Sequence, residues 1–429
     1  MKSQIEYYSC FNIDPKIIEL AGKAEEEVKS SFYKIDKIKE QNQLKVIRAM
    51  QLEKLSDTHF SGTTGYGYND RGREVLDAVY AHAFEAEDAI VRHNITCGSH
   101  ALALCLYGIL RPGDELLSIT GKPYDTLDEV IGIRGEEGSG SLKEYGVTYK
   151  QVELTQDGVI DDQAVTEAIN ERTKLIFIQR SRGYAWRPAL TVSEIKRVVQ
   201  LVKSVKKDVL VMVDNCYGEF VEEREPTAVG VDIIAGSLIK NPGGGLVPSG
   251  GYIAGRKDLV EKISYRMTIP GLGREVGATL GHNRLMFQGF FMAPHVVAES
   301  LKGAVFASQV MKSLGFETCP GPFEPRCDII QSIKFNKEDA VIAFCQGIQK
   351  GSPVDSFVRP EPWDMPGYDS PVIMAAGAFI QGSSIELSAD APIRPPYVAY
   401  MQGGLVYEHI KLGVMCAVQE LADKKIINL

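Results

Sequence analysis

The chain has 429 residues, of which 44% are apolar and 24% charged, a balance typical of a globular protein with a large buried core. Its 47 basic and 56 acidic residues give a formal net charge of −9, and no basic block offers a stripe for nucleic-acid phosphates. No apolar run has the length of about 18 residues that a membrane span needs, so we expect neither nucleic acid nor membrane as a partner.

Cysteine and histidine usage excludes two further classes of site. The eight cysteines are scattered without a CxxC pair, and the seven histidines show no HExxH spacing. Neither a disulfide framework nor a metal site is therefore expected. The first residues, "MKSQIEYYSCFNIDPK", lack the apolar stretch of a signal peptide. We expect a reduced, cytoplasmic protein.

The chain opens with a predicted helical arm. Residues 14–55 are charged and favour helix, but their apolar positions are too sparse for an independent domain. We expect residues 1–60 to pack on the main body or on a partner. The stretch "HFSGTTGYGYNDRGRE" follows, and its glycines and tyrosines predict a loop.

Strand-like and helix-like segments alternate between residues 72 and 265. The predicted helices include "SHALALCLYGIL", "DDQAVTEAINERT" and "TVSEIKRVVQLVKSV". The predicted strands are "DAIVR", "DELLSI", "VTYKQVEL", "KLIFIQ", "DVLVMVD", "DIIAGS" and "GGYIAG". Such alternation is typical of an α/β fold with βαβ crossovers and a mostly parallel sheet buried on both faces.

A smaller α+β unit is predicted at the C-terminal end. A long helical stretch runs to about residue 314, and the segment "CPGPFEP" marks a boundary. The strands "DIIQSIKFN", "VIMAAGAFI" and "SIELSAD" follow, with helices near 337–350 and 403–424. The predicted organisation is therefore an arm at 1–60, a large domain at 61–314 and a small domain at 315–429.

Three features of the large domain could carry chemistry. Asp214 ends the strand "DVLVMVD", and Lys240 follows "DIIAGSLI". Gly98, Ser99 and His100 lie where a strand gives way to a helix, whose free amides and dipole favour an anion such as phosphate. Each feature has an ordinary alternative, since aspartate and serine cap turns and helices and a lysine is often only solvated.

Together, the three features predict a pyridoxal 5'-phosphate (PLP) site. PLP needs a lysine that bonds covalently to its aldehyde, a carboxylate beside its pyridine nitrogen and a cradle for its phosphate. Lys240, Asp214 and residues 98–100 supply these groups at the carboxyl ends of parallel strands, where such sheets bind ligands. Tyr124, after another strand, is suitably placed to stack on the ring.

The segments "VDNCYGEF", "CGSHA", "PYDT" and "GSLIK" resemble motifs of the group formed by cystathionine β-lyase, cystathionine γ-synthase and methionine γ-lyase. Over roughly residues 50–425, the chain resembles the branch called methionine γ-lyase-related or aluminium resistance proteins, whose hallmarks include "GYGYNDRGRE", "QRSRGYAWRPALT" and "SLIKNPGGGLVPSGGYIAG". This resemblance implies the aspartate-aminotransferase-like fold (fold type I), with a seven-stranded sheet, and a homodimer or homotetramer.

The resemblance also implies residue roles. It implies that the catalytic residues are Lys240, Tyr124 and Asp214, with PLP covalently bound to Lys240, and that Arg394 binds the substrate carboxylate. It implies cofactor contacts for Gly98, Ser99, His100, Tyr124, Asp214, Ser237 and Lys240, and for Tyr66, Tyr68 and Arg73 from the neighbouring subunit. The roles of Arg180 and Arg182 stay open. Two departures from the group are Ile239 in place of a threonine, and Tyr66-Gly67-Tyr68 in place of Tyr-x-Arg.

The expected activity is a PLP-dependent lyase that breaks C–S bonds of sulfur amino acids such as cystathionine, cysteine or methionine, by α-proton abstraction and β- or γ-elimination. Two alternatives remain open. One is another PLP reaction, such as transamination or aldol cleavage, which the same residues would serve. The other is a non-catalytic PLP-binding protein of the stress response. A nucleotide-binding enzyme is disfavoured because the sequence has no GxGxxG or GxxxxGK[ST] motif.

Overall fold

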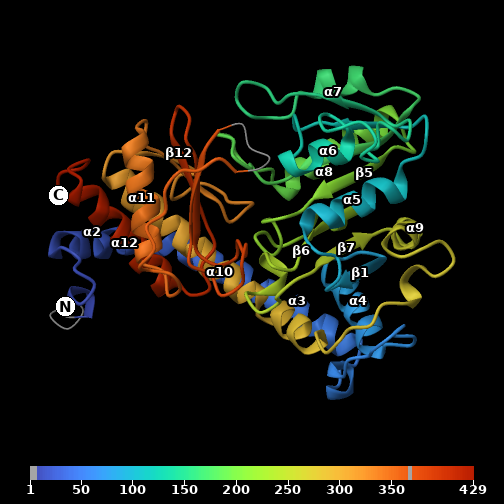
Figure 1. Cartoon of the computed structure of the whole chain (residues 1–429), viewed down its shortest axis with the longest axis horizontal. Helices are drawn as coiled ribbons and strands as arrows, with labels where there is room; N and C mark the ends of the chain where they lie inside the picture. The colour runs from blue at the N-terminus through green and yellow to red at the C-terminus, as the bar shows by residue number, and fades with distance from the viewer. Residues whose placement is uncertain (1–6, 366–369) are drawn as a thin grey trace. The chain divides into compact units, whose positions relative to one another are not determined.

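The computed structural model describes residues 7–365 and 370–429 (Figure 1). Within this described part, the chain forms two compact units. The larger unit comprises Gln41–Gly183 and Ala189–Ala293, and the smaller comprises the segment that ends at Glu40 together with Tyr184–Pro188 and Pro294–Leu429.

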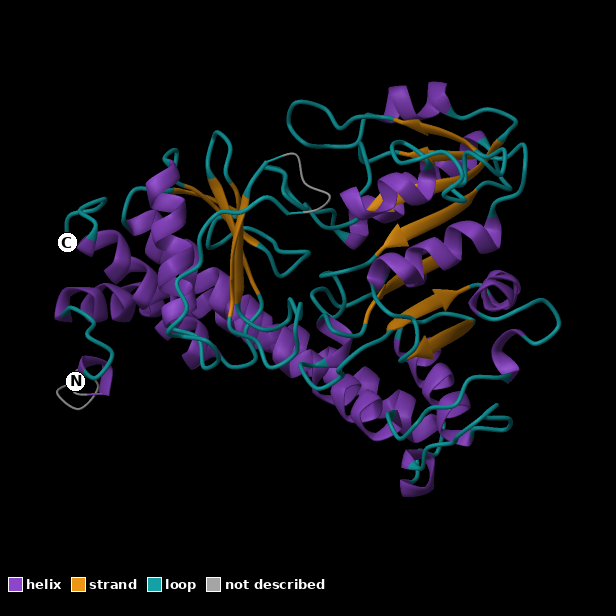
Figure 2. Ribbon diagram, viewed as in Figure 1, coloured by secondary structure: helices purple, strands orange, loops and turns teal. Residues whose placement is uncertain are grey.

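A seven-stranded sheet forms the centre of the larger unit (Figure 2). Its strands are β1 (Asp88–Arg92), β2 (Glu115–Ser118), β3 (Thr148–Gln151), β4 (Thr173–Gln179), β5 (Leu210–Asp214), β6 (Ile233–Ser237) and β7 (Gly251–Gly255). Their order is β1-β7-β6-β5-β4-β2-β3. All neighbours are parallel except β7, which is antiparallel to both β1 and β6. The predicted α/β fold with a mostly parallel seven-stranded sheet is confirmed.

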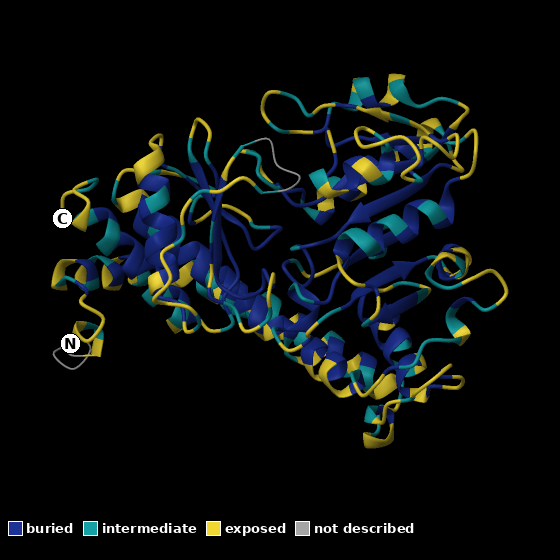
Figure 3. Ribbon diagram, in the orientation of Figure 1, coloured by how far each residue is buried: buried dark blue, intermediate teal, exposed yellow. Residues whose placement is uncertain are grey.

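Helices cover this sheet, and both faces of its central strands are buried (Figure 3). The helices of the larger unit are α4 (Arg71–Ala83), α5 (Gly98–Ile109), α6 (Asp128–Ile131), α7 (Asp162–Ala168), α8 (Val192–Val205) and α9 (Lys257–Met267). On one face, Ile233, Met212 and Phe177 pack with apolar residues of α5 and α9. The alternate residues Ile234 and Val213 are equally buried, as expected for a sheet covered on both faces.

Helix α8 illustrates how local sequence sets these elements. Thr191 accepts a hydrogen bond from the backbone N–H of Glu194, and the Glu194 carboxylate accepts one from the backbone N–H of Thr191, which completes a capping box. The apolar residues that follow recur at helical spacing and are buried against the unit. Short 3-10 turns occur at Asp57–Phe60, Asp125–Leu127, Pro226–Val229, Asn241–Gly243 and Gly273–Glu275.

The glycine run after Lys240 is explained by close backbone packing. Gly244 has a φ of +54°, and a Cβ placed there would lie 2.4 Å from the carbonyl oxygen of Gly289. A Cβ at Gly289, on α10 (Asn283–Ser313), would lie 2.4 Å from the carbonyl oxygen of Gly243. Only glycine allows this approach, so the run fixes the turn that carries Lys240 against a helix.

The smaller unit has a five-stranded antiparallel sheet in the order β10-β11-β12-β9-β8. Its strands are β8 (Glu317–Cys319), β9 (Gln331–Lys334), β10 (Val372–Ala376), β11 (Ser388–Pro392) and β12 (Val398–Gln402). Its core also draws on α2 (Pro15–Glu27), α11 (Glu338–Lys350) and α12 (Tyr407–Asp423). Helices α3 (Lys29–Leu52) and α10 each contribute residues to both units.

Two predicted strands of this sheet begin later than their sequence patterns indicate. "DIIQSIKFN" predicts a strand from Asp328, whereas β9 begins at Gln331. "SIELSAD" predicts a strand from Ser384, whereas β11 begins at Ser388. The Glu386 carboxylate accepts hydrogen bonds from the backbone N–H groups of Phe379 (2.8 Å) and Ile380 (2.9 Å). This side chain therefore stabilises a turn where the apolar alternation alone predicts extended chain. In the described residues, no helix combines the length and apolarity required to cross a membrane.

The smaller unit also contains a buried acid, Asp390. Its Oδ2 accepts a hydrogen bond from the Gln402 amide (3.2 Å), and the Tyr184 side chain is a further hydrogen-bond partner. The Tyr184 ring lies 5.3 Å from that of Tyr400, which is paired with Asp390 across β11 and β12. Burial raises the pKa of Asp390 to about 7, although the bond to Tyr184 opposes this.

Replacing Asp390 by asparagine is expected to change how stability depends on pH. A buried acid with a raised pKa costs folding free energy as the pH rises from its ordinary pKa to the raised one, and asparagine does not. Between pH 4 and pH 8, the free energy of unfolding of the variant should rise by up to about 4 kcal/mol relative to that of the parent. Urea unfolding at the two pH values measures this gain. Exposed Asp423→Asn is the control, and an equal difference at both pH values would contradict the prediction.

Candidate functional site

The carboxyl ends of β5 and β6 bring three of the predicted site residues, Asp214, Ser237 and Lys240, to one edge of the sheet. Gln179 of β4 pairs with Asp214 of β5, and Asp214 pairs with Ala235 of β6. Ser237 ends β6, and Lys240 follows it after a further turn. Because parallel strands end together, Asp214 and Lys240 lie at the edge where open α/β sheets bind ligands.

Asp214 is almost entirely buried and lies within electrostatic reach of Lys240. The backbone N–H of Cys216 donates to its Oδ1 at 3.1 Å, and 7% of the residue is exposed. Burial raises the pKa of Asp214, and Lys240 and the bond from Cys216 partly offset this. The carboxyl group is therefore in a place where a second cationic partner would stabilise its charge.

Lys240 is half-buried, and its ammonium faces an aromatic ring. Its Nζ lies 4.0 Å from the centroid of the Tyr217 ring, within the range of cation–π attraction. Burial lowers the pKa of Lys240, but the acidic groups of Cys216, Tyr217 and Asp214 raise it, and the net direction is upward. The resting side chain is an ammonium that must lose a proton before it can act as a nucleophile or a base.

Tyr217, within the segment "VDNCYGEF", is not among the residues that the sequence predicts for the site. The backbone of Tyr217 has a φ of +73° and that of Phe220 a φ of +63°, both rare for residues that are not glycine. This turn after β5 points the Tyr217 ring at Lys240. Its strain is held by the packing around it, as is common at functional sites.

The start of α5 lies beside the ends of β5 and β6. A Cβ at Gly98 would lie 3.2 Å from the Cys216 Sγ and 3.4 Å from the Ser237 Cβ. The Cys97 Sγ accepts a hydrogen bond from the backbone N–H of His100 at 3.4 Å, which caps the helix. The absence of a side chain at Gly98 therefore lets the positive end of the helix dipole approach this edge of the sheet.

Polar side chains surround this helix start. The Ser99 hydroxyl lies 2.6 Å from that of Thr126, and the His100 Nδ1 accepts a hydrogen bond from the backbone N–H of Thr96 at 3.1 Å. The Ser237 hydroxyl accepts one from the backbone N–H of Ile239 at 3.3 Å. Burial lowers the pKa of His100, so its neutral form is favoured and the helix amides supply the positive field.

Tyr124 lies on a loop that is tied to the same region. The bond between Ser99 and Thr126 joins this loop to α5. Tyr124 is half-buried, and a Cβ at Gly183 would lie 3.9 Å from its ring. The structure thus brings the Tyr124 loop and the start of α5 together.

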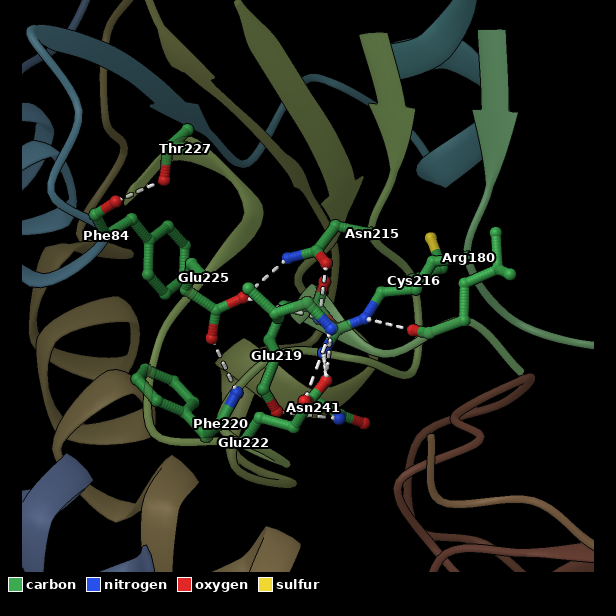
Figure 4. Close-up of polar contacts among 12 residues, drawn as sticks. Phe84, Arg180, Asn215, Cys216, Glu219, Phe220, Glu222, Glu225, Thr227 and Asn241 are labelled. Atoms are coloured by element: carbon green, nitrogen blue, oxygen red, sulfur yellow. Dashed lines mark hydrogen bonds and ion pairs between the residues drawn. The ribbon is translucent and has the colours of Figure 1, made fainter. Parts of the chain in front are cut away.

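Arg180 supports the turn that carries Asp214 (Figure 4). Its guanidinium donates to the Asn215 side-chain oxygen at 2.7 Å and to a Glu222 carboxylate oxygen at 2.6 Å. A Cβ at Gly218 would lie 2.4 Å from its Nη1, so this packing requires a glycine. Arg180 therefore makes structural contacts, and Arg182 is buried as well.

Tyr66 and Tyr68 lie on the loop before α4, and Arg73 lies in the first turn of that helix. Tyr66 and Tyr68 are exposed, with ring centroids 5.6 Å apart. Arg73 is buried and donates to the backbone carbonyls of Gly67 and Gly277, both at 2.8 Å. These contacts give Arg73 a role in holding the loop and do not support the prediction that it binds phosphate. Arg394 belongs to the smaller unit and is exposed.

Comparison with known proteins gives one family and several close relatives. The family model for methionine gamma-lyase matches residues 17–422. The chain is 54% identical to the uncharacterized protein YnbB of Bacillus subtilis, over 95% of this chain and 97% of that one. It is similar to the crystal structure of a carbon-sulfur lyase involved in aluminum resistance from Clostridium novyi NT, with a TM-score of 0.95, 52% identity and coverage of 98% and 99%. The pyridoxal-5'-phosphate dependent protein YhfS of Escherichia coli, at 16% identity and a TM-score of 0.61, covers 91% of this chain and 97% of its own and shares the fold.

Proposed function

The chain belongs to the methionine gamma-lyase family, and from this premise we propose that it is a PLP-dependent lyase acting on C–S bonds of sulfur amino acids. The observation that carries the proposal is the pairing of a buried carboxyl, Asp214, with a lysine, Lys240, at one edge of the sheet beside the start of α5. The 52% identical carbon-sulfur lyase from Clostridium novyi supports the same activity.

The residues present fit PLP. Asp214 is buried near one cation and can accept a second, which the pyridinium nitrogen would provide. The amides at the start of α5 are approachable because Gly98 has no side chain, and they suit a phosphate. We propose that these amides, with Ser99, His100 and Ser237, hold the phosphate, and that the Lys240 amine bonds covalently to the aldehyde.

Each residue then has a defined task. When bound, PLP supplies an electron-withdrawing ring that stabilises negative charge at the substrate Cα. Asp214 keeps a proton on the ring nitrogen. Lys240, as the free amine, takes the Cα proton as general base. Before it loses its proton, its ammonium rests against the face of the Tyr217 ring. Tyr124 positions the ring by stacking and gives a proton to the leaving thiolate.

We also propose a homo-oligomer, a dimer or a tetramer, in which the loop with Tyr66 and Tyr68 reaches the site of a neighbouring subunit. The exposure of these two aromatic side chains supports this, because large exposed aromatic residues are typical of interfaces. The family's amino-acid substrates are small molecules, and a cytoplasmic location stays a prediction.

Arg394→Ala is expected to weaken substrate binding far more than cofactor binding. Arginine meets a carboxylate through two parallel hydrogen bonds, and the loss of such a charged contact should raise KM roughly 10- to 100-fold. Steady-state kinetics together with a cofactor titration separate the two effects. Arg359→Ala, which removes another exposed arginine of the smaller unit, is the control. Equal losses of substrate and cofactor affinity would refute the assignment.

A substrate screen tests the proposed function itself. The purified, PLP-loaded protein is incubated with cystathionine, cysteine, homocysteine and methionine, and the keto acid, ammonia and thiol are measured. Pyruvate or 2-oxobutyrate in equal amount with ammonia supports the lyase, together with a thiol from cystathionine or methionine, or hydrogen sulfide from cysteine or homocysteine. Glutamate formed from added 2-oxoglutarate supports an aminotransferase instead, and no turnover of any of these substrates would overturn the proposal.

A further inference from the structure

Glu219 is a second buried carboxyl group close to the lysine site. It lies in the turn after β5 and is fully buried. Its Oε1 accepts a hydrogen bond from the Tyr252 hydroxyl at 2.7 Å. Its Oε2 has no hydrogen-bond partner among the residues that the structure describes, and the same is true of the buried Tyr80 hydroxyl, which lies within electrostatic reach of Glu219.

Two neighbouring acids, Glu222 and Glu225, accept hydrogen bonds from a cation or from several donors (Figure 4). Glu222 bonds to Arg180 at 2.6 Å. Glu225 lies 3.6 Å from Arg180 and accepts hydrogen bonds from the Asn215 amide (2.9 Å) and the backbone N–H of Phe220 (2.8 Å). Within the described ranges no cation lies within 4.0 Å of Glu219, so a charge there would be poorly compensated.

The groups that face Glu219 come from several elements, and they are Tyr252 of β7, Tyr80 of α4, Glu225, Cys216 and Lys240. Burial raises the pKa of Glu219 to about 8, and the charge of Glu225 acts in the same direction. The bond from Tyr252, a hydrogen bond from the backbone of Glu219 itself and the charge of Lys240 only partly offset this. The geometry and the surrounding charges agree that the carboxylic acid form is favoured at neutral pH.

We propose that Glu219 is a positioning residue that stays uncharged at neutral pH and so leaves Asp214 as the one carboxylate acting on Lys240. The ammonium of Lys240 must become a free amine before it can bond to an aldehyde. A second carboxylate would stabilise the ammonium and withhold that amine. Above about pH 8, Glu219 ionises, and its carboxylate then stabilises the Lys240 ammonium. The protonation of Glu219 itself needs no cofactor. Its effect on PLP binding rests on the proposed function, in which Lys240 is the lysine that bonds to PLP.

The first test observes the proton directly, in the apoprotein. Asp390, whose pKa is also raised to about 7, is replaced by asparagine in every protein of this test, so that its proton does not contribute. In this background, infrared difference spectra at pH 7 should show the carbonyl stretch of protonated carboxylic acid, and Glu219→Gln should lose the contribution of Glu219. Glu225→Gln, an equally buried change in the same network, should leave that band in place. Tyr252→Phe removes the hydroxyl that favours the charged form, so the band should persist to higher pH. An unchanged band in Glu219→Gln would overturn the proposal.

The second test follows PLP capture by the apoprotein, by stopped-flow absorption between pH 7 and pH 9. The ratio of the Glu219→Gln rate to the parent rate should rise several-fold across this range, because only the parent gains a second carboxylate. A flat ratio would overturn the positioning role. If neither protein captures PLP, the proposed function fails, while the infrared result still decides whether Glu219 is uncharged.

Discussion

Lys240→Ala is expected to abolish both the yellow colour of the PLP-loaded protein and its turnover. In the proposed site the colour comes from a covalent bond between the lysine amine and the aldehyde of PLP, and alanine has no amine. The same side chain is the proposed general base, whose loss costs roughly 10²- to 10⁴-fold in rate. Its position beside Asp214 and over the Tyr217 ring supports both roles.

Absorption spectra after incubation with PLP, and lyase assays, measure the two effects of Lys240→Ala. Borohydride reduction of the parent followed by peptide mass spectrometry should place the pyridoxyl group on the peptide that contains Lys240. Lys262→Ala, which removes an exposed lysine of α9, controls for general effects of losing a lysine. A yellow Lys240→Ala protein would show that another amine holds the cofactor.

Much of the larger unit could be predicted because its central strands are short, continuous apolar runs between helical patterns. All seven strands lie where these runs predict them. Their order in the sheet and the antiparallel direction of β7 could not be predicted, because periodicity reports which residues are buried and not which strands pair. In the smaller unit, the Glu386 turn displaces the start of β11, since a side-chain bond to the backbone leaves no periodic signal.

In the candidate site, too, some positions could be predicted from the sequence and others could not. Asp214 and Lys240 could be predicted because each ends or follows an apolar strand, where parallel sheets bind ligands. The positions of Tyr217 and Glu219 could not, because a turn with positive φ aims the Tyr217 ring at Lys240 and buries the Glu219 side chain. The structural contacts of Arg73 were equally hidden, since its partners at Gly67 and Gly277 are far apart in the sequence.

Asp214→Ala is expected to leave PLP bound, because the lysine bond and the phosphate contacts remain, but to remove most of the activity. In the proposed site the carboxylate keeps a proton on the ring nitrogen, and without it the ring would withdraw charge from the substrate Cα less strongly. Losing one such preorganised electrostatic contact costs about 10²- to 10³-fold in kcat. The effect should fall on kcat rather than KM, because the charge develops only as the Cα proton leaves.

Steady-state kinetics and loss of the α-hydrogen from deuterium-labelled substrate separate these effects. Asp208→Ala removes an exposed aspartate next to the opposite end of the same strand and should leave both parameters unchanged. Burial raises the pKa of Asp214 in the free protein, but alanine also removes a partner of Lys240 and the acceptor of the Cys216 N–H, so the stability of the apoprotein is measured alongside. An apoprotein of parent stability that binds PLP and turns over at the parent rate would show that Asp214 does not act on the ring. A variant that loses only PLP affinity would instead show that Asp214 helps to bind PLP and has no part in the reaction.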